Sequence, residues 1–316
     1  MPLFDVYIFV DWNAANSLGP PKPTQDNVWI GEHDSNGKYC EIYCRSRSDC
    51  IDYLVDILRN YIEKRRSVLI GFDFPYGYPK GFVNALGYES RLPSWQEAWV
   101  DLLKRIKDKS NNNNNRFQVA NDLNAKIGGI GGAPPGPFWG RPQNNTLNNL
   151  HYLNTNAPTF PYKAANGISL ERLRIVESRL PGVQETWGLY GAGRVGSQAM
   201  VGIPRLHYLR NHEALSPYSQ VWPFETGFSL KSIPKQGPFI LHAEIWPGVV
   251  RQETYVLLAK EPKLIRDRAQ VRAMCQWANK LDEGNELGQF FSSPQRLSEK
   301  QIQDCIEAEG WILGAL

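Results

Sequence analysis

Four acidic residues lie at the ends of segments that the sequence predicts to be buried: Asp11, Asp73, Glu244 and Asp267. The pattern assigns no Lys or Arg to neutralise them. Two carboxylates that lie close together repel each other unless they share a proton or a metal ion. Carboxylate oxygens are also the ligands that hard cations such as Mg²⁺ and Mn²⁺ prefer. We therefore expect these four residues to bind metal ions and to be the catalytic residues of a hydrolytic site.

Divalent ions in such a site would catalyse the cleavage of a phosphodiester. Two ions about 4 Å apart stabilise the attacking and leaving oxygens of an in-line displacement at phosphorus, and one ion lowers the pKa of a bound water that acts as the nucleophile. A general-base histidine is then unnecessary, and the five histidines form no recognisable triad with Ser or Cys. The motifs GxSxG and HExxH are absent. The expected cofactor is Mg²⁺ or Mn²⁺, bound as two ions.

The first two acids follow apolar segments that are predicted to be buried strands. Residues 4–11 end on Asp11, and residues 68–72 are followed by Asp73. Several Pro and Gly residues come directly after Asp73, and they cannot continue a central strand. An acid at the end of a buried strand loses hydration energy unless a cation or a donor meets it. Both aspartates are therefore expected to face a ligand site.

The segment between these strands predicts how they pair. Residues 27–33 and 38–44 form two strands around an Asn-Gly turn, and residues 51–62 have the apolar spacing of a helix capped by Ser46 or Ser48. A right-handed crossover through that helix places the strands of the two aspartates parallel and side by side. The order strand, hairpin of two strands, helix, strand predicts an α/β chain with an RNase H-like mixed sheet. Any small α/β domain with two incidental acids is the alternative.

The chain divides into three parts. Residues 1–79 are expected to form the first half of the RNase H-like core, and residues 168–316 the second half with C-terminal helices. Residues 80–167 are expected to be a large loop-rich insertion with one helix over residues 95–109. The insertion contains the Asn run 111–115 and a Gly- and Pro-rich stretch, a composition that does not bury a core. We expect a mobile or lid-like insertion, with the Asn run as a plain surface loop.

The other two acids belong to the second half of the core. Glu244 lies in the apolar segment 239–245, which is predicted to be a strand. Asp267 lies in the first turn of a helix predicted over residues 264–281, where the helix dipole favours an acid in any case. His242, two residues before Glu244, is expected to be a core histidine.

The second half also contains four candidates for substrate binding. Arg174 and Glu177 lie in a charged segment that is compatible with a strand, and Glu225 ends another short strand. The segment 191–196 matches GxGxxG, but it lacks the preceding strand and the acid about 20 residues on that a dinucleotide site requires. The helix that follows can instead bind phosphate at its N-terminus, beside Arg194. We therefore expect Arg174, Glu177, Arg194 and Glu225 to bind substrate.

A set of six segments is distinctive when taken together: residues 10–14, 71–79, 174–177, 221–226, 243–247 and 309–314. This set resembles an uncharacterised family related to the predicted nucleases of RNase H fold. The resemblance implies metal ligands at Asp11, Asp73 and Glu244, with Asp267 as a fourth acid on a helix. Related chains often have a small hydroxyl residue where this chain has Asn13. Some relatives have labels for molybdopterin or cobalamin biosynthesis, which nothing in these residues supports.

The leading hypothesis is a metal-dependent nuclease, with two alternatives from other classes. The surface is expected to include two basic segments, residues 59–66 and 104–109, which would follow a nucleic-acid backbone. It is also expected to include Trp95 and Trp139, which would stack on bases. An ATP-dependent phosphotransferase of the actin and sugar-kinase type needs glycine soon after the first aspartate, and residues 11–16 lack it. The second alternative is a non-catalytic binding module on the same fold.

Composition sets outer limits on these hypotheses. The formal net charge of +3 is too small to indicate nucleic-acid binding without a local patch. No apolar run approaches the roughly 18 residues of a membrane span, and the N-terminus has no basic region followed by an apolar stretch. The five cysteines form no CxxC pair. We expect reduced thiols in a cytoplasmic protein, with nucleic acid as its partner and no contact with membrane.

Overall fold

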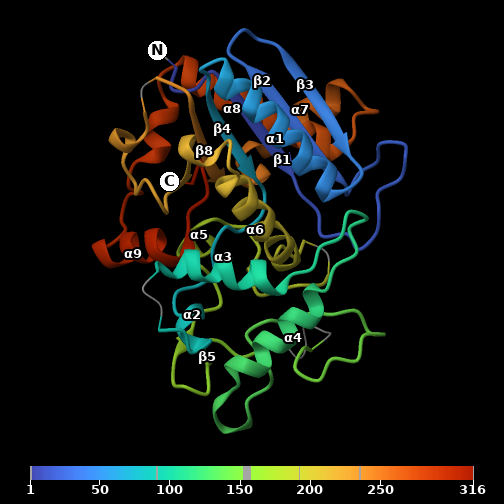
Figure 1. Cartoon of the computed structure of the whole chain (residues 1–316), viewed down its shortest axis with the longest axis vertical. Helices are drawn as coiled ribbons and strands as arrows, with labels where there is room; N and C mark the ends of the chain where they lie inside the picture. Colours follow the sequence, from blue (N-terminus) through green and yellow to red (C-terminus); the bar gives the residue numbers. More distant parts are fainter. Residues whose placement is uncertain (1, 90–91, 152–157, 192, 235, 316) are drawn as a thin grey trace.

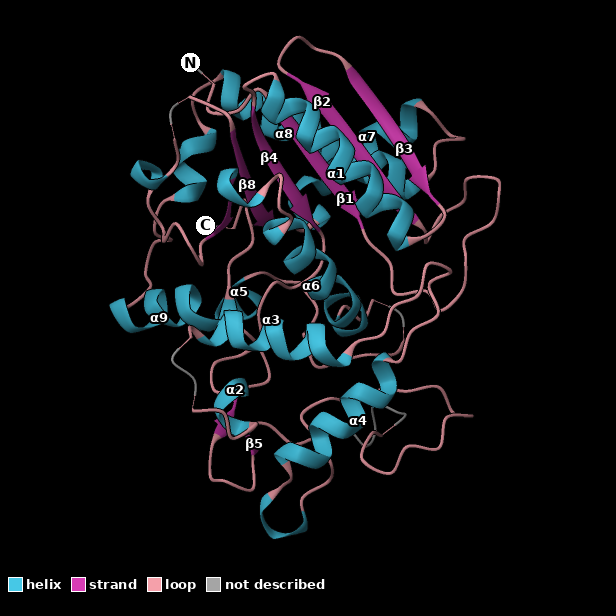
Figure 2. Cartoon of the chain, in the orientation of Figure 1, coloured by secondary structure: helices cyan, strands magenta, loops and turns pink. Residues whose placement is uncertain are grey.

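The computed structural model describes residues 2–89, 92–151, 158–191, 193–234 and 236–315. Its central feature is a six-stranded sheet in the order β3-β2-β1-β4-β8-β7, with helices on both faces (Figure 1, Figure 2). The sheet is mixed, because β3, β2 and β1 pair antiparallel whereas β1, β4, β8 and β7 pair in parallel. The expected α/β class with a mixed sheet is confirmed.

The elements have the following bounds. The sheet strands are β1 Val6–Asp11, β2 Val28–Asp34, β3 Tyr39–Cys44, β4 Ser67–Phe72, β7 Ser219–Trp222 and β8 Phe239–Glu244. A separate two-stranded pair is formed by β5 Tyr162–Lys163 and β6 Ser169–Leu170. The helices are α1 Arg47–Glu63, α2 Phe82–Ala85, α3 Ser94–Arg105, α4 Arg116–Ile127, α5 Ile175–Arg179, α6 Gly196–Asn211, α7 Arg251–Lys260, α8 Arg266–Glu283 and α9 Glu299–Asp304.

The register of the parallel strands brings their carboxyl ends to one edge of the sheet. Val10 of β1 lies opposite Phe72 of β4, and Phe72 lies opposite Glu244 of β8. Asp11 and Asp73 are the next residues along their strands, so they leave the sheet side by side. The expected parallel and adjacent placement of these two strands is therefore confirmed.

Side chains that alternate along the central strands form two hydrophobic layers, one on each face of the sheet. The layer on the α1 face includes Ile8, Ile70 and the α1 residue Leu54. The layer on the other face includes Phe9 and the α8 residue Met274. Because β1 and β4 are buried from both sides, nearly all of their side chains are apolar. Each fully buried large aliphatic or aromatic side chain contributes roughly 1.5–3 kcal/mol to folding.

The hairpin and the first helix begin as the sequence predicts. Gly37 has a φ of 83° in the turn between β2 and β3, a left-handed conformation that glycine adopts without steric cost. Ser46 caps α1, because its side chain accepts a hydrogen bond from the Asp49 N–H while the Asp49 carboxylate accepts one from the Ser46 N–H. α1 then returns the chain across the sheet, and β4 enters beside β1.

The segment around Arg174 forms a helix, so the expected strand over residues 170–179 is wrong. β6 ends at Leu170, and α5 begins after Arg174, which is its N-cap residue. The Glu177 carboxylate accepts hydrogen bonds from the Arg174 backbone N–H at 2.9 Å and from the Arg174 Nε at 2.7 Å. These bonds favour a helical turn, because residues three apart lie on one face of a helix.

Residues 80–167 have buried apolar side chains that are continuous with the core on the α1 face of the sheet. Trp99, Leu123 and Phe138 are fully buried and belong to the same layer as the α1 residues. In Figure 1, α2, α3 and α4 lie below the sheet, and α3 packs along α6. The expectation that this composition does not bury a core is wrong, since aromatic and aliphatic residues between the Asn- and Gly-rich stretches supply one.

The two tryptophans expected on the surface are also buried. Trp95 is 7% exposed and stacks on Phe224, with ring centroids 4.9 Å apart. Trp139 is 1% exposed, and the guanidinium of Arg194 lies 4.6 Å from the centroid of its ring. The expectation that these rings stack on bases is therefore wrong, because each ring is packed inside the protein.

The Asn run is anchored in the interior and is not a plain surface loop. Asn112 is 1% exposed. Its side-chain oxygen accepts a hydrogen bond from the Arg47 N–H at 2.9 Å, and its amide nitrogen donates to the carbonyls of Ser17 at 3.1 Å and Arg45 at 3.3 Å. These bonds connect the insertion to the loop that follows β1.

All five cysteines are free thiols, as expected, and all but Cys40 are buried. Along the described ranges, no helix combines the length and the apolar composition that crossing a membrane requires.

We expect Asn112→Ala to destabilise the protein by about 2–4 kcal/mol. The substitution removes one hydrogen bond from the buried Arg47 N–H and two from the part-buried carbonyls of Ser17 and Arg45. It also leaves alanine, whose side chain cannot form these bonds, in a left-handed conformation with a φ of 68°. Urea unfolding measures the change in free energy. Asn113→Ala is the matched control, because Asn113 is exposed in the same run and should change stability by less than about 0.5 kcal/mol. Equal losses for the two variants would contradict the anchor.

Candidate functional site

The carboxyl edge of the sheet opens into a cavity of about 670 Å³ that has acids on one side. Asp11, Asp73 and Asp267, three of the four expected acids, line this cavity together with Asp26. The remaining walls include the segment before α6 and Arg116. In open α/β sheets, ligands bind in the crevice outside the carboxyl ends of the strands. The structure therefore brings these three acids together at the position where a ligand is expected.

Asp11 is the last residue of β1, and its carboxylate makes no hydrogen bond to any residue that the structure describes. The side chain is half-buried and reaches the cavity. Burial raises the pKa of Asp11 well above its usual value, and the nearby carboxylates of Asp73, Asp267 and Asp26 raise it further. An ionised Asp11 is thus unfavourable unless a cation reaches it through the cavity.

Asp73 follows β4 directly and has one oxygen fixed by the backbone. Its Oδ1 accepts the Trp12 N–H at 2.7 Å, a bond that favours the ionised form. Burial outweighs this bond and, with the charge of Asp267, raises the pKa of Asp73 to about 7. The Trp12 hydrogen bond therefore orients the carboxylate without neutralising it.

Asp267 reaches the cavity from the first turn of α8, which packs across β1 and β2. Its carboxylate accepts a hydrogen bond from the Asp26 N–H at 2.6 Å, and burial raises its pKa. Asp26 is a site residue that the sequence does not predict, and it lies in an irregular loop with a φ of 60°. No periodic pattern identifies a loop residue of this kind.

Glu244 ends β8 at the same edge, but an arginine already neutralises it. The Arg174 Nη1 and Nη2 atoms donate to its two oxygens at 2.8 and 2.6 Å, and the Tyr76 N–H donates at 2.9 Å. The expectation that no Lys or Arg neutralises the four acids is therefore wrong for Glu244. Because both of its oxygens are occupied, Glu244 is not retained as a metal ligand.

Arg174 and Glu177 belong to a buried ion-pair network and not to an open binding surface. Both side chains are completely buried. Arg174 also donates to the Glu309 carbonyl at 2.8 Å, and Glu177 accepts the Thr186 hydroxyl at 2.8 Å. Burial alone would lower the pKa of Arg174, but Glu244 and Glu177 raise it above its usual value. The network fixes the end of β8, so we do not retain Arg174 and Glu177 as substrate-binding residues.

Arginines line the same cavity as the acids. The Arg194 guanidinium lies 3.8 Å from Glu185 and faces the cavity at the segment before α6. Arg116, the first residue of α4, donates its Nε to the Ser197 hydroxyl at 2.8 Å, and it has no carboxylate partner within 4 Å along the described ranges. Burial lowers the pKa of Arg116 to about 10. The sequence does not predict Arg116 at the site, because it directly follows the Asn run that is expected to be a plain surface loop.

The GxGxxG segment 191–196 forms the turn into α6. Gly196 donates its N–H to the Gly188 carbonyl at 3.0 Å, and a Cβ at Gly196 would lie 2.2 Å from the Thr186 carbonyl oxygen. Glycine is therefore required at position 196 for close packing of backbone against backbone. Ala192, within this motif, lies outside the described residues. The expected helix over residues 197–209 is confirmed by α6.

Glu225 does not line the cavity that contains the acids, nor a smaller cavity that adjoins it at Asp73. Its carboxylate pairs with Arg210, with both oxygens at 2.8 Å, and accepts the Val221 N–H at 2.8 Å. These bonds fix the turn after β7. The placement gives no reason to assign Glu225 to substrate binding.

Two other expected features have a structural explanation. His242 is fully buried, its Nε2 lies 3.4 Å from the Ser219 hydroxyl, and burial lowers its pKa to about 3, so it is the neutral core histidine that was expected. The basic segment 59–66 closes α1 just before β4 begins at Ser67, whereas Asp73 follows the far end of β4. That segment therefore lies at the edge of the sheet opposite the acids.

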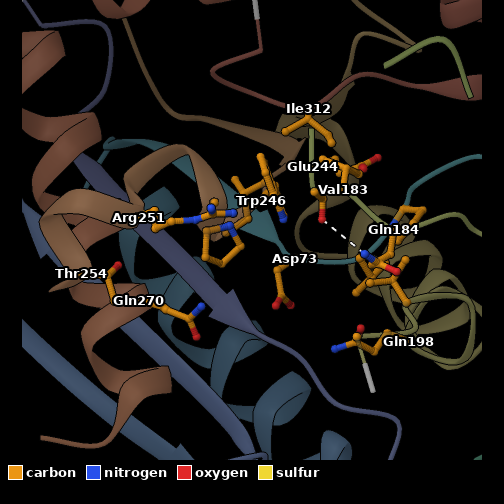
Figure 3. A pocket seen from close by; sticks show the side chains of 18 of the residues that line it. Asp73, Val183, Gln184, Gln198, Glu244, Trp246, Arg251, Thr254, Gln270 and Ile312 are labelled. Carbon is orange, nitrogen blue, oxygen red and sulfur yellow. Dashed lines mark hydrogen bonds between the residues drawn. The ribbon is translucent and has the colours of Figure 1, made fainter. Parts of the chain in front are cut away.

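A smaller cavity of about 320 Å³ adjoins the first one, and Asp73 lines both. Figure 3 shows the Asp73 carboxylate pointing away from Trp246, toward the space between Gln270 and Gln198. Glu244 and its partner Arg174 form part of the floor. Asp73 therefore lies at the junction of two cavities.

The described acids of the cavity offer carboxylate oxygens but do not form a complete metal-binding group by themselves. In the portion of the chain that the structure describes, no three His, Cys, Asp or Glu side chains are grouped closely enough to hold a metal ion by themselves. Mg²⁺ commonly keeps several waters and is bound by one or two carboxylates together with substrate phosphates. Asp11 and Asp73 are the pair that could hold such an ion.

We expect Asp73→Asn to stabilise the metal-free protein above pH 7 and to have little effect near pH 4. The pKa of Asp73 is about 7 in the folded protein and about 3.9 in an unfolded chain. The folded state therefore binds the proton more tightly, and stability is lost as the pH rises between these two values. One pKa unit corresponds to about 1.4 kcal/mol, so the difference of about three units gives an expected gain of about 4 kcal/mol at pH 8. Urea unfolding at pH 4 and pH 8 with EDTA measures it.

Glu244→Gln serves as the contrasting variant in the same experiment. It removes one partner of a buried ion pair, so it should destabilise the protein at pH 8 by about 3 kcal/mol. Stabilisation by both variants would contradict the distinction between a repulsive acid and a neutralised one.

Comparisons of the chain with protein-family models, with curated proteins and with solved structures found no match. The chemistry of the site must therefore be inferred from its own acids, arginines and cavities.

Proposed function

We propose that the chain is a metal-dependent phosphodiester hydrolase, a nuclease with an RNase H-like fold, whose metal ligands include Asp11 and Asp73. One observation supports this proposal most strongly. Two adjacent parallel strands each lead to an aspartate at the same cavity, and along the described ranges neither carboxylate has an Arg or Lys partner within 4 Å. Asp267 completes the acidic wall from α8.

The strand order supports an RNase H-like topology. A strand, an antiparallel hairpin, a helix and a strand parallel to the first give the order β3-β2-β1-β4. β8 and β7 then extend the sheet in parallel on the other side of β4. Since one fold can host many unrelated activities, the functional proposal depends on the acids and not on the topology.

The electrostatics of the acids favour a bound cation. Burial and mutual repulsion raise the pKa values of Asp11, Asp73 and Asp267. A divalent ion held by Asp11 and Asp73 would relieve that repulsion. When bound, the ion would supply a polarised phosphoryl oxygen and a water of lowered pKa. Mg²⁺ and Mn²⁺ fit the oxygen ligands present.

The arginines of the cavity suit a phosphate bound beside such an ion. Arg116, Arg194 and Arg266 line the same cavity as the acids. Guanidinium groups bind phosphate oxygens through charge-assisted hydrogen bonds, often in pairs. A phosphodiester bound in this cavity would have its negative charge met by the ion and by the arginines, which is the arrangement that stabilises charge developing in phosphoryl transfer.

The main test is cleavage of nucleic acid. Asp11→Asn and Asp73→Asn should each reduce Mn²⁺-dependent hydrolysis of single-stranded DNA or RNA by at least about 100-fold, because a metal ion contributes several kcal/mol to transition-state stabilisation. Asp56→Asn is the control, since Asp56 is an exposed acid on α1. Gel analysis of end-labelled oligonucleotides measures the rates. Undiminished cleavage by either site variant would refute the proposal.

Metal binding can be tested without a substrate. Mn²⁺ at about 100 times its dissociation constant should stabilise the wild-type protein by about 2.7 kcal/mol, because the ion binds the folded state only. For a chain of this size, this corresponds to a rise in Tm of roughly 5 °C. Asp11→Asn should lose this rise, and Asp56→Asn should keep it. A wild-type Tm that does not respond to Mn²⁺ or Mg²⁺ would favour a non-catalytic binding module.

A further inference from the structure

The smaller cavity beyond Asp73 has well-defined walls. The loop after β8 supplies Trp246, the first residue of α7 supplies Arg251, and the first turns of α8 supply Arg266 and Gln270. The loop that contains Val183 forms the opposite wall (Figure 3). Asp73 connects this pocket to the acidic cavity.

Four side chains in this pocket have hydrogen-bond donors without a protein acceptor, and two of these side chains, Arg251 and Arg266, are exposed to solvent. The guanidinium groups of Arg251 and Arg266, the indole N–H of Trp246 and the amide of Gln270 make no hydrogen bond or ion pair within 4 Å to other residues that the structure describes. Polar groups that converge in a concave site without internal partners indicate a polar ligand. A ligand for this set must offer several acceptor atoms.

The charges of the pocket favour an anion. Arg251 and Arg266 form no ion pair within 4 Å in the described residues, although the charge of Arg266 lowers the pKa of Asp11 and Asp267, whereas Glu244 is neutralised by Arg174. Asp73 is the one remaining acid of the lining, and it faces the metal site as well. Planar guanidinium groups bind phosphate through two parallel hydrogen bonds. Phosphate is therefore the anion that matches these donors best.

The dimensions of the pocket limit how much it can hold. Its volume of about 320 Å³ is near the lower end of ligand pockets. An Arg251 Nη atom lies 3.5 Å from the position of a Cβ at Gly182, so this side chain reaches the opposite wall. Gly248 packs directly on Trp246, since a Cβ there would lie 2.3 Å from the indole ring. The space suits one phosphate-bearing end group and not a continuing polymer.

We propose that this pocket binds the terminal phosphate of a nucleic-acid chain, so that the enzyme removes nucleotides from a chain end. The proposal rests on the hydrolase function proposed above. Arg251 and Arg266 hold the terminal phosphate, and Trp246 and Gln270 donate to the same end group. The next phosphodiester then lies at Asp73, where the two cavities meet.

The cleavage step is a hydrolysis and needs water as its only co-substrate. The water oxygen forms a new bond to phosphorus, and the bond from phosphorus to the leaving oxygen breaks. One water proton is released to solvent, and the leaving oxygen takes up a proton to become a hydroxyl group. The products are a released nucleotide and a chain shortened by one unit, with no change in oxidation state.

The experiment compares linear and circular substrates of the same sequence with the full chain and Mn²⁺. Single-stranded oligodeoxynucleotides with a 5′-phosphate, with a 3′-phosphate or with neither are tested beside a covalently closed circle. One phosphorylated linear substrate should be cleaved at least about tenfold faster than its unphosphorylated form, because a hydrogen bond to a charged group contributes at least about 1.5 kcal/mol. The circle should not be cleaved.

Arg251→Gln tests the assignment of the pocket. It should remove the tenfold advantage of the terminal phosphate. Arg59→Gln, an exposed arginine at the far end of α1, should keep it. Calorimetry with a nucleoside monophosphate, and separately with inorganic phosphate, reports binding without cleavage. Arg251→Gln should weaken nucleotide binding at least about tenfold. If the wild-type protein binds inorganic phosphate but not the nucleoside monophosphate, the contacts of the pocket are limited to the phosphate group.

The outcomes separate this inference from the hydrolase proposal. Equal cleavage of circle and linear chain, with Asp73→Asn inactive, would overturn the terminal-phosphate pocket and leave the hydrolase intact. Nucleotide binding that is unchanged in Arg251→Gln would also overturn it. If no variant or substrate shows cleavage, loss of nucleotide binding in Arg251→Gln still supports the pocket, and the hydrolase proposal alone fails.

Discussion

The parallel pairing of β1 with β4 is the constraint on which the rest of the site depends. Both strands are buried on two faces, so a shift of one residue would turn the side chains of each layer to the wrong face. This fixed register makes Asp11 and Asp73 neighbours whether or not their charges favour it. The apolar core must offset their repulsion. The two adjacent acids therefore lower the stability of the protein at the position where a ligand can bind them.

The edge of the sheet separates two kinds of acid. Glu244 is held by Arg174, and that pair closes the floor of the smaller cavity. Asp11 and Asp73 reach open space, and neither carboxylate has an arginine or lysine partner within 4 Å among the described residues. If Arg174 were turned toward Asp73, the acidic pair would be neutralised by the protein itself. Arg174 thus neutralises Glu244 inside the protein, whereas Asp11 and Asp73 remain available to a ligand.

Local signals account for what the sequence predicted correctly. Apolar runs, an Asn-Gly turn and the Ser46 cap define the first four strands and α1 because each depends on neighbouring residues only. The partner of Glu244 could not be predicted, since Arg174 lies 70 positions away and sequence does not reveal which charges meet. The sequence predicts Asn112 on the surface. It could not predict the burial of this polar side chain, because the burial depends on hydrogen bonds to residues distant in sequence. Composition alone likewise misplaced Trp139.

The anchoring of the loop after β1 has a consequence for how the protein is made. Residues 12–27 contain no helix or strand, and part of this loop is held by side chains about 95 positions later, at Asn112 and Asn114. Chains emerge from the ribosome N-terminus first. The strand of Asp11 is therefore synthesised well before the residues that shape the loop beside it. Asp267, which accepts the Asp26 N–H and completes the acidic wall, emerges later still, so the acidic edge can reach its final form only late in synthesis.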